Sequence, residues 1–346
     1  MTQDRKILIT GASGLVGSHV AHYFSRYEKN VFCLVRKESR IDFIKDLPVT
    51  FIYGDITDLA SLENLFKGMD RIIHTAGKVT DWGDYRDYYQ TNVTGTLNVL
   101  KAAYRNHISR VIITGSVSSY GEENSKVLKD ETFPFRSHYP YAFDRILPSG
   151  MNHYSDTKAE STRLALAFAE EHGMDLTVLE PVWVYGENEF SSGFYEYLSI
   201  AKSGFPFMPG CKSNTFHVIY ARELARAYYL VFQKQVSGMT RIIIGNREPE
   251  NMQSIYDLFC REAGVKKPRN IPKWTIYPLA LLLESLYALL QRNSPPLLTR
   301  SRVNMFYDSI GFSTVRAEKL LGFKNQISLE EGIHKTVQWY KKNNWL

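Results

Sequence analysis

Cysteine is scarce in this sequence, with three residues among 346. Cys33, Cys211 and Cys260 are odd in number and far apart, so they match neither a disulfide framework nor a metal-binding spacing. A reducing compartment is therefore expected. The nine histidines include no His-Glu-x-x-His or comparable cluster, and we predict no metal site.

Long hydrophobic runs are also lacking. The N-terminal MTQDRKILIT has no apolar run of the length found in signal peptides, so a cytoplasmic location is expected. The most apolar stretch is WTIYPLALLLESLYALLQR at 274–292, and its uninterrupted apolar core is only Leu279–Leu283, because Pro278 precedes it and Glu284 ends it. This stretch falls short of the about 20 apolar residues that span a bilayer. Two interpretations remain: a helix of a C-terminal lobe, which we prefer, and a helix lying peripherally on an anionic membrane.

The net excess of basic charge is confined to one segment. The formal net charge is +6, and residues 261–302 hold eight Lys or Arg against Glu262 and Glu284, so the rest of the chain is neutral overall. A nucleic-acid-binding protein would favour a basic stripe across the molecule, which is absent. We therefore expect no nucleic-acid partner.

What the chain does contain is a regular alternation of apolar runs and helical patterns in its first half. Alternation at this spacing predicts βαβ units, and hence an α/β fold with a doubly wound parallel sheet. The predicted strands are 6–10, 31–35, 49–53, 71–75, 110–114 and 176–180, and the predicted helices are near 15–27, 58–67, 85–106 and 153–172.

The rhythm changes after residue 180. The later segments indicate a smaller C-terminal lobe, with a strand near 241–245 that returns to the sheet. The sequence thus predicts a nucleotide-binding domain at 1–180 and a substrate lobe at 181–346. The helices expected in the second part are 221–234, 250–263, 274–292 and 328–341.

A glycine-rich loop follows the first predicted strand and opens a helix, reading TGASGLVGSHV. Glycines at this place allow a sharp turn and a close approach to a pyrophosphate, which the helix N-terminus stabilises. Because the loop lies between a strand and a helix at the start of a βαβ series, we predict a Rossmann-type dinucleotide site. Its expected cofactor-binding residues are Gly11, Ser13, Gly14, Leu15, Val16 and Gly17.

The end of the second predicted strand indicates which dinucleotide is bound. NAD sites have a carboxylate there for the ribose hydroxyls, whereas NADP sites have Arg near the 2′-phosphate. The sequence CLVRKESR has Arg36 at this position and Lys37 beside it, so we predict NADP, with NAD as the second choice. A solvated basic turn is the alternative interpretation.

A tyrosine and a lysine lie four positions apart in MNHYSDTKAE, at Tyr154 and Lys158. On a helix they occupy one face, one turn apart, but the bare pattern is common by chance. A near-copy, Tyr141 with Arg145, is a rival. We prefer Tyr154 because Lys158 leads into a helix and a strand that continue the fold, whereas Tyr141 lies between two prolines.

Six segments in the expected order together resemble the extended short-chain dehydrogenase/reductases, over nearly the whole chain. They are TGASGLVG, GDITD (54–58), HTAG (74–77), TNVTGTLNVL (91–100), TGSVSSYG (114–121) and EPVWVYG (180–186), with Tyr154 and Lys158 as the Tyr-x-x-x-Lys pair. The resemblance implies catalytic residues Ser116, Tyr154 and Lys158, supported by Asn92. It also implies cofactor contacts from Asp55, Ile56, Thr75, Ala76, Gly77, Tyr154, Lys158, Pro181 and Val184.

The implied chemistry is hydride transfer between a nicotinamide and a carbonyl or carbinol carbon. Tyr154 would be the general acid/base, and since an ordinary Tyr titrates near 10 it needs a cation such as Lys158. Ser116 would donate to the substrate oxygen. Its place follows from aligning Tyr120 and Gly121 with the family motif, and Ser118 and Ser119 remain alternative hydroxyls.

The substrate class is narrowed by departures from the family's other branches. The dehydratases of this family share an acidic pair beside the catalytic hydroxyl, and this chain has Val117 and Ser118 at those positions. Sugar-nucleotide enzymes of the family often have an Asn shortly after the sixth-strand proline, and this chain has Val184 there. Glu180 also replaces the frequent Arg. The segment HTAGKVTDWG and the C-terminal tail resemble the branch of 3β-hydroxysteroid dehydrogenases and dihydroflavonol reductases.

We therefore expect an NADP-linked oxidoreductase for a ketone or alcohol of a bulky apolar substrate, steroid-, flavonoid- or 3-oxoacyl-like. The alternatives are a nucleotide-sugar epimerase with tightly bound NAD and a non-catalytic dinucleotide-sensing protein. The aromatic, proline-rich stretch 132–153 is either a substrate lid or a surface loop. The helices near 85–106 and 153–172 resemble the pair through which related proteins form a homodimer, although their apolar faces could equally be core.

Overall fold

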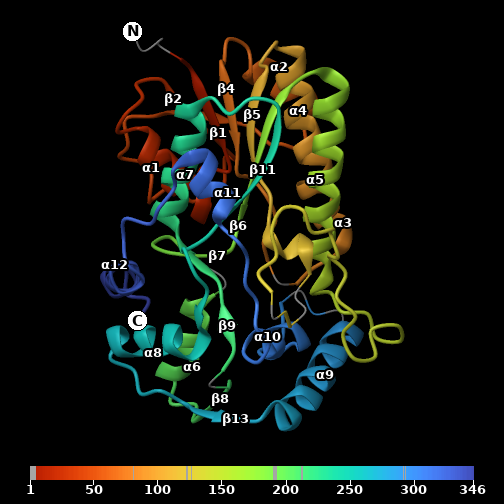
Figure 1. Ribbon diagram of the computed structural model, residues 1–346, viewed down its shortest axis with the longest axis vertical. Coiled ribbons are helices and arrows are strands. Elements are labelled where there is room, and N and C mark those ends of the chain that lie inside the picture. Colours follow the sequence, from red (N-terminus) through yellow and green to blue (C-terminus); the bar gives the residue numbers. More distant parts are fainter. Residues whose placement is uncertain are drawn as a thin grey trace.

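A computed structural model describes residues 5–80, 82–121, 124–125, 127–189, 193–211, 213–290, 292 and 294–346. Its centre is a seven-stranded sheet in the order β11-β6-β5-β4-β1-β2-β3, and every neighbouring pair is parallel (Figure 1). This confirms the predicted doubly wound sheet. The strands are β1 (Ile7–Thr10), β2 (Val31–Val35), β3 (Thr50–Tyr53), β4 (Arg71–His74), β5 (Arg110–Thr114), β6 (Asp175–Pro181) and β11 (Met239–Ile244).

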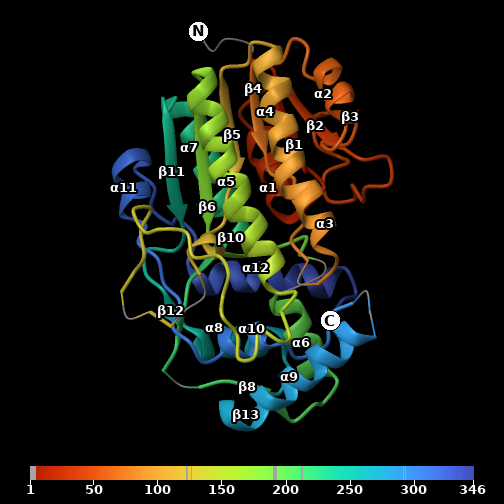
Figure 2. The same cartoon turned by 90° about the vertical axis from the view of Figure 1, so that its right-hand side faces the viewer.

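Helices cover both faces of the sheet (Figure 2). On one face lie α1 (Leu15–Phe24) and α7 (Ala221–Lys234); on the other lie α2 (Leu59–Leu65), α4 (Gly95–Arg105) and α5 (Asn152–His172). Each face has its own buried apolar cluster. The strands are rich in Ile and Val because both of their faces are covered.

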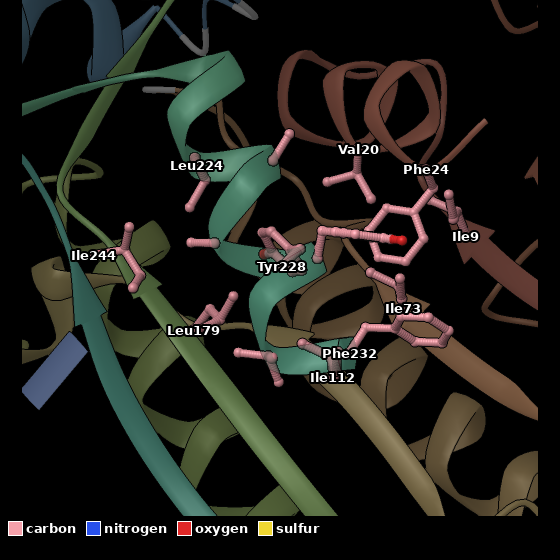
Figure 3. Close-up of a cluster of buried hydrophobic side chains, with 14 of the residues drawn as sticks. Ile9, Val20, Phe24, Ile73, Ile112, Leu179, Leu224, Tyr228, Phe232 and Ile244 are labelled. Atoms are coloured by element: carbon pink, nitrogen blue, oxygen red, sulfur yellow. The ribbon is translucent and has the colours of Figure 1, made fainter. Parts of the chain in front are cut away.

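Helix α7, from the second half of the chain, covers the same face of the sheet as α1. Tyr228 and Phe232 of α7 lie toward Phe24 of α1, whereas Leu224 lies on the side of Leu179 and Ile244 of the sheet (Figure 3). Burying a large apolar side chain of this kind is worth about 1.5–3 kcal/mol. The sheet layer of the first half therefore depends on residues after 220.

The C-terminal lobe lies at the carboxyl edge of the sheet and is rich in packed aromatic side chains. Short two-stranded pairings hold its loops, and α11 packs against β11 and α7. Its helices are α6 (Phe194–Lys202), α8 (Met252–Ala263), α9 (Lys273–Leu289), α10 (Arg300–Met305), α11 (Val315–Leu321) and α12 (Leu329–Lys342). Its strands are β7 (Trp183–Tyr185), β8 (Phe207–Pro209), β9 (Thr215–Phe216), β10 (Val218–Tyr220), β12 (Glu250–Asn251) and β13 (Arg269–Ile271).

The strand expected near 241–245 is observed as β11, at the edge of the main sheet. The division into 1–180 and 181–346 stays a prediction. None of the helices in the described ranges combines the length and the apolar character that crossing a bilayer requires.

The helix expected at 274–292 is observed as α9, which contains Pro278. A proline here removes the hydrogen bond to the carbonyl of Trp274, one turn earlier. Trp274 is 77% exposed and Pro278 is also exposed, so water can satisfy that carbonyl.

Candidate active site

The carboxyl ends of the parallel strands bring the predicted site segments to one edge of the sheet. Gly11 follows β1, Arg36 follows β2, Thr75 follows β4 and Ser116 lies just beyond β5, while Pro181 ends β6. The strand order reverses between β1 and β4, since β2 and β3 lie on one side and β5 and β6 on the other. Such a switch point is where open α/β sheets bind dinucleotides.

The three glycines of the loop after β1 have different surroundings. Gly11 has φ +71°, and a Cβ there would lie 2.5 Å from the backbone nitrogen of Ala76. A Cβ at Gly17 would lie 2.2 Å from the carbonyl oxygen of Gly11. At Gly14 the nearest atom would be that same oxygen at 3.4 Å. Gly11 and Gly17 thus permit close packing, whereas Gly14 leaves an exposed cradle.

The cradle at Gly14 fits a pyrophosphate. Gly14 is the N-cap of α1 and offers no side-chain hydrogen bond to the first turn, which contains Leu15, Val16 and Gly17. The first-turn N–H groups of a helix lack intrahelical partners and carry its positive end. Ser13 is half-buried at the rim of the loop. The residues present therefore fit the phosphates of a dinucleotide.

Thr75, Ala76 and Gly77 form the segment that backs this loop. The Thr75 hydroxyl donates to the carbonyl of Thr10 at 2.7 Å, which ties the end of β4 to the end of β1. Ala76 is the residue against which Gly11 packs, and a Cβ at Gly77 would lie 3.2 Å from Oδ1 of Asn92. These three residues are thus at the switch point, as their expected role requires.

Arg36 is exposed immediately after β2. Its backbone N–H donates to Oγ of Ser39 at 3.1 Å, which shapes the turn. Within the described part of the chain, no hydrogen bond or ion pair involves its guanidinium group. The guanidinium is therefore available to an anion from solution.

The two residues expected beside the adenine differ in exposure. Asp55 is half-buried, and its Oδ1 accepts from the N–H of Thr57 at 2.9 Å and from its hydroxyl at 2.8 Å. Ile56 is 7% exposed and packs against Gly95 of α4. Ile56 therefore presents little side chain to a ligand, and Asp55 mainly shapes the turn after β3.

Ser116 begins a short 3-10 turn, Val117–Tyr120, just after β5. Its Oγ accepts from the N–H of Ser118 at 3.2 Å and lies 2.8 Å from Oγ of Ser118. Ser118 is half-buried, so the structure places this alternative hydroxyl beside Ser116. Ser119 is fully buried, and its Oγ has no hydrogen-bond partner among the described residues.

Tyr154 and Lys158 lie in the first two turns of α5, which packs against the Ser116 turn. Lys158 is 7% exposed, and its Nζ donates to the carbonyl oxygen of Thr114 at the end of β5. Burial lowers the pKa of Lys158 to about 8, against the opposing effect of the Glu180 carboxylate. Tyr154 is half-buried.

Tyr228 of α7 also lies at the end of β5, where its hydroxyl is hydrogen-bonded to that of Thr114. Burial raises the pKa of its hydroxyl, and the nearby Tyr154 adds to the shift. The rival Tyr141 has different surroundings: it is 3% exposed, and the guanidinium of Arg300 lies 5.6 Å from its ring centre. The structure gives Tyr141 a packing position in the 132–153 loop.

Asn92 lies in a π-helix, η1 (Tyr89–Thr94), between the short helix α3 (Tyr85–Tyr88) and α4. Its Oδ1 accepts from the N–H of Lys78 at 2.7 Å, and its Nδ2 donates to Oγ1 of Thr157 at 3.1 Å. Thr157 immediately precedes Lys158. Single π-turns of this kind are frequent at functional sites, and this one joins the segment after β4 to α5.

His74, at the end of β4, escaped the sequence analysis as a residue of interest. Its Nδ1 lies 2.7 Å from the Thr10 hydroxyl and its Nε2 lies 3.0 Å from the Thr96 hydroxyl, which donates to the carbonyl of Asn92 at 2.7 Å. Burial and, to a smaller extent, the charge of Lys158 lower the pKa of His74 to about 3. A neutral His74 thus lies near Lys158. The motif HTAG contains this histidine but does not indicate its hydrogen bonds to Thr10 and Thr96.

Asn188 was also missed. It is 2% exposed, its Nδ2 donates to Oγ of Ser18 at 2.9 Å and to the carbonyl of Ser13 at 3.4 Å, and its Oδ1 has no partner among the described residues. Glu187 beside it accepts from the Tyr220 hydroxyl at 2.7 Å. The segment after β7 therefore closes onto the start of α1, and nothing in the motif EPVWVYG indicated this contact.

The segment expected to cover the nicotinamide runs from Pro181, the last residue of β6, to Val184 in β7. Val184 is half-buried and pairs with Ile219 of β10. Glu180, just before Pro181, is fully buried and accepts from Nε of Arg241 at 3.1 Å. The Arg241 guanidinium is therefore already paired with the Glu180 carboxylate. A sugar-nucleotide site would instead have a cation here that is available to bind its ligand.

Together these residues place a hydroxyl, a phenol and a buried amine around the end of β5, beside a pyrophosphate cradle. Such a set can orient one substrate oxygen and move a proton at it. Among the described residues, no cluster of three or more His, Cys, Asp or Glu is suited to a metal ion.

Comparison with known proteins finds relatives over nearly the whole chain. A 2-alkyl-3-oxoalkanoate reductase of Stenotrophomonas maltophilia is 26% identical over 341 residues, covering 95% of this chain and 98% of the relative. A sterol-4-alpha-carboxylate 3-dehydrogenase (decarboxylating) of Candida albicans is 26% identical over 359 residues, covering 98% of each. The crystal structure of Thermus thermophilus UDP-glucose 4-epimerase in complex with NAD matches with a TM-score of 0.73 at 19% identity, covering 97% of this chain and 99% of that one.

The model of the NAD dependent epimerase/dehydratase family matches residues 7–245, which is more than half of the chain. This range contains the glycine loop, the seven sheet strands, Ser116 and the Tyr154–Lys158 pair. The chain therefore belongs to the NAD dependent epimerase/dehydratase family, as an NAD(P)-dependent oxidoreductase of the extended short-chain dehydrogenase/reductase type.

Proposed function

We propose that this protein is an NADP-dependent oxidoreductase that reduces a ketone, or oxidises the alcohol, of a bulky apolar substrate of steroid, flavonoid or 3-oxoacyl type. The observation that carries the cofactor choice is Arg36, exposed at the end of β2 with a guanidinium free to bind an anion. A carboxylate at this place would repel a 2′-phosphate, whereas a guanidinium can bind it bidentately.

The apolar substrate class is supported by the surroundings of β6 and by two relatives. Val184 offers no polar group to a nucleotide phosphate, and Arg241 is held by Glu180 at 3.1 Å. The names of the reductase and dehydrogenase relatives specify 2-alkyl-3-oxoalkanoates and sterol carboxylates, both apolar over most of their surface.

In the proposed reaction the dinucleotide supplies the hydride when it is bound. Tyr154 donates its phenolic proton to the carbonyl oxygen during reduction and takes it back during oxidation. Lys158 lowers the cost of the phenolate by its charge, and Ser116 donates a hydrogen bond that fixes the substrate oxygen. Asn92 positions α5 through Thr157.

The test of the cofactor choice is a fluorescence titration of the purified protein with NADPH and NADH, repeated on Arg36→Ala. Charged hydrogen bonds of about 1.5–3 kcal/mol predict roughly a 10- to 100-fold weaker NADPH affinity in the variant, with NADH affinity unchanged. Lys37→Ala is the matched control, because Lys37 is the neighbouring exposed cation.

If Arg36→Ala bound NADPH as tightly as the original protein does, the NADP assignment would be overturned. The substrate class is tested separately, by following NADPH consumption with steroid, flavonoid and 3-oxoacyl ketones. If none of these is reduced and a UDP-sugar is interconverted instead, the protein is a nucleotide-sugar epimerase.

A further inference from the structure

The outward face of α9 is an uncovered apolar stripe. The residues that face the lobe are buried, namely Ile276, Ala280 and Glu284. The opposite side carries Leu279, Leu282, Leu286 and Leu289, which are three or four positions apart and therefore share one face of the helix, with Trp274 near its start and Leu290 just after its end. The exposed fractions of Trp274, Leu279, Leu282, Leu286, Leu289 and Leu290 are 77%, 47%, 64%, 44%, 80% and 53%.

The 132–153 loop extends this stripe. Phe143, Ile146 and Leu147 are exposed by 64%, 77% and 41%. The loop is fixed to α9 from inside, because Arg300 donates to the carbonyls of Ala142 at 2.7 Å and Leu147 at 2.9 Å while it is paired with Glu284. The exposed apolar side chains of the loop and of the helix therefore belong to one surface.

An open pocket of about 510 Å³ lies between the loop and the helix. Its lining includes Tyr139, Pro140 and Ala142 from the loop and Trp274, Tyr277 and Pro278 from α9. We call the α9 stripe, the loop tip 143–147 and this pocket the α9 surface. Contiguous exposed apolar surface with a polar rim often marks a site that binds a protein or a membrane.

The rim of the α9 surface is cationic. Arg145 lies within the loop tip, Arg269 lies just before α9 and Arg292 just after it, and all three are exposed. No ion pair of these three arginines is found among the described residues. The only acidic residue from 263 to 292 is Glu284, and it is buried. Asp144, the acid of the loop tip, is engaged with His138 at 3.0 Å.

The position of α9 leaves the surface accessible. Both views place α9 at the end of the molecule opposite the N-terminus, at the outer side of the C-terminal lobe (Figures 1 and 2). A flat surface can therefore approach α9 without meeting α2 or the upper ends of α4 and α5.

We propose that the α9 surface binds anionic phospholipid bilayers peripherally. In the bound state α9 lies in the plane of the headgroups, with its leucine stripe and Phe143 and Ile146 at the boundary with the acyl chains. Trp274 takes the position that Trp favours at membrane interfaces, and the arginines contact lipid phosphates. The charge of the rim favours anionic lipid over an apolar partner protein.

The test is co-sedimentation of the full chain with vesicles of phosphatidylcholine mixed with phosphatidylglycerol, and with vesicles of phosphatidylcholine alone. We expect pelleting with the anionic vesicles at low salt, and much less at high salt or with neutral vesicles. In Leu282→Glu/Leu289→Glu the partition coefficient should fall roughly tenfold or more, because two charges enter the apolar stripe.

The matched control is Val315→Glu/Leu320→Glu, which adds the same charges to exposed positions of α11, 51% and 43% exposed. It should pellet like the original chain, and NADPH binding should be equal in all three proteins. The proposal is overturned if the original chain does not pellet with anionic vesicles at low salt, or if the α9 variant pellets as well as the control. A concentration-dependent dimer in sedimentation velocity that only the α9 variant loses would assign the surface to self-association instead.

Discussion

Lys158 illustrates how position sets the chemistry of a single residue. It extends from α5 into the interior and donates to the carbonyl of Thr114, so its charge is held near the end of β5. Burial lowers the pKa of its ammonium to about 8, and the buried Glu180 counteracts part of that effect. The cation is thus present at neutral pH and is lost as the pH rises through the lowered pKa.

This predicts an alkaline limit on catalysis. In the direction of reduction, kcat/KM should decrease as the pH rises above about 8, because the free enzyme then loses the Lys158 charge that assists Tyr154. Lys158→Arg, which keeps its charge, should move the decrease to higher pH, and Lys158→Met should lower kcat by roughly 10²- to 10⁴-fold. The measurement is kcat/KM as a function of pH for the three proteins; an unchanged alkaline limb in Lys158→Arg would exclude Lys158 as its cause.

At the scale of elements, the 132–153 loop depends on one buried ion pair. Glu284 of α9 is 2% exposed and Arg300 at the start of α10 is 1% exposed, with Nη2 and Oε1 3.0 Å apart. Arg300 also donates to two loop carbonyls, so it holds the loop as well as its acidic partner. Removing one member of such a pair leaves the other charge buried without compensation.

We therefore expect Glu284→Gln to lower the free energy of unfolding by about 3–5 kcal/mol, measured by urea denaturation. In Glu284→Leu/Arg300→Met, much of that loss should be recovered, because the uncompensated charge is gone. The carbonyls of Ala142 and Leu147 lose their donor only in the double variant, so trypsin should cleave after the exposed Arg145 faster there than in the original chain. Equal cleavage rates would show that the loop is held by other contacts.

The elements that the sequence predicted well are those with a strong pattern. The βαβ series of the first half and α7 follow from apolar runs and helical periodicity. The glycine loop, Ser116, Tyr154 and Lys158 were selected from motifs, and their roles stay a prediction. The six-residue α10 and the short strands of the lobe were not predicted, since segments of this length carry no periodicity of their own. The π-helix at Asn92 was expected as ordinary helix, because it depends on contacts with Lys78 and Thr157 that are distant in sequence.

At the scale of the whole molecule, the homodimer expected through the helices near 85–106 and 153–172 stays a prediction. An exposed row of tyrosines on these helices is the surface that it would use. Tyr85, Tyr89 and Tyr104 are exposed by 42%, 40% and 47% along α3, η1 and α4. The ring of Tyr104 lies 4.5 Å from that of His172 of α5, so both helices contribute to this aromatic face. Aromatic side chains are enriched in protein interfaces.

We expect the protein to have the mass of a dimer by light scattering after gel filtration. Tyr104→Glu should shift it to the monomer, because it places a charge in the proposed interface. Tyr53→Glu, at a tyrosine 51% exposed on β3, is the control and should stay dimeric. A monomeric mass for the original chain would refute the dimer.

The edge strand β11 has a consequence for how the protein is made. The ribosome releases β1 to β6 and α1 first, yet α7 and β11, at Ala221–Ile244, are needed to cover α1 and complete the sheet. At about 5–20 residues per second, roughly 3–13 s of translation separate Pro181, the end of β6, from Ile244, the end of β11. During that time the nascent chain exposes the apolar face that Leu224, Tyr228 and Phe232 will occupy, so the first part of this protein is a natural client for chaperones until its second half emerges.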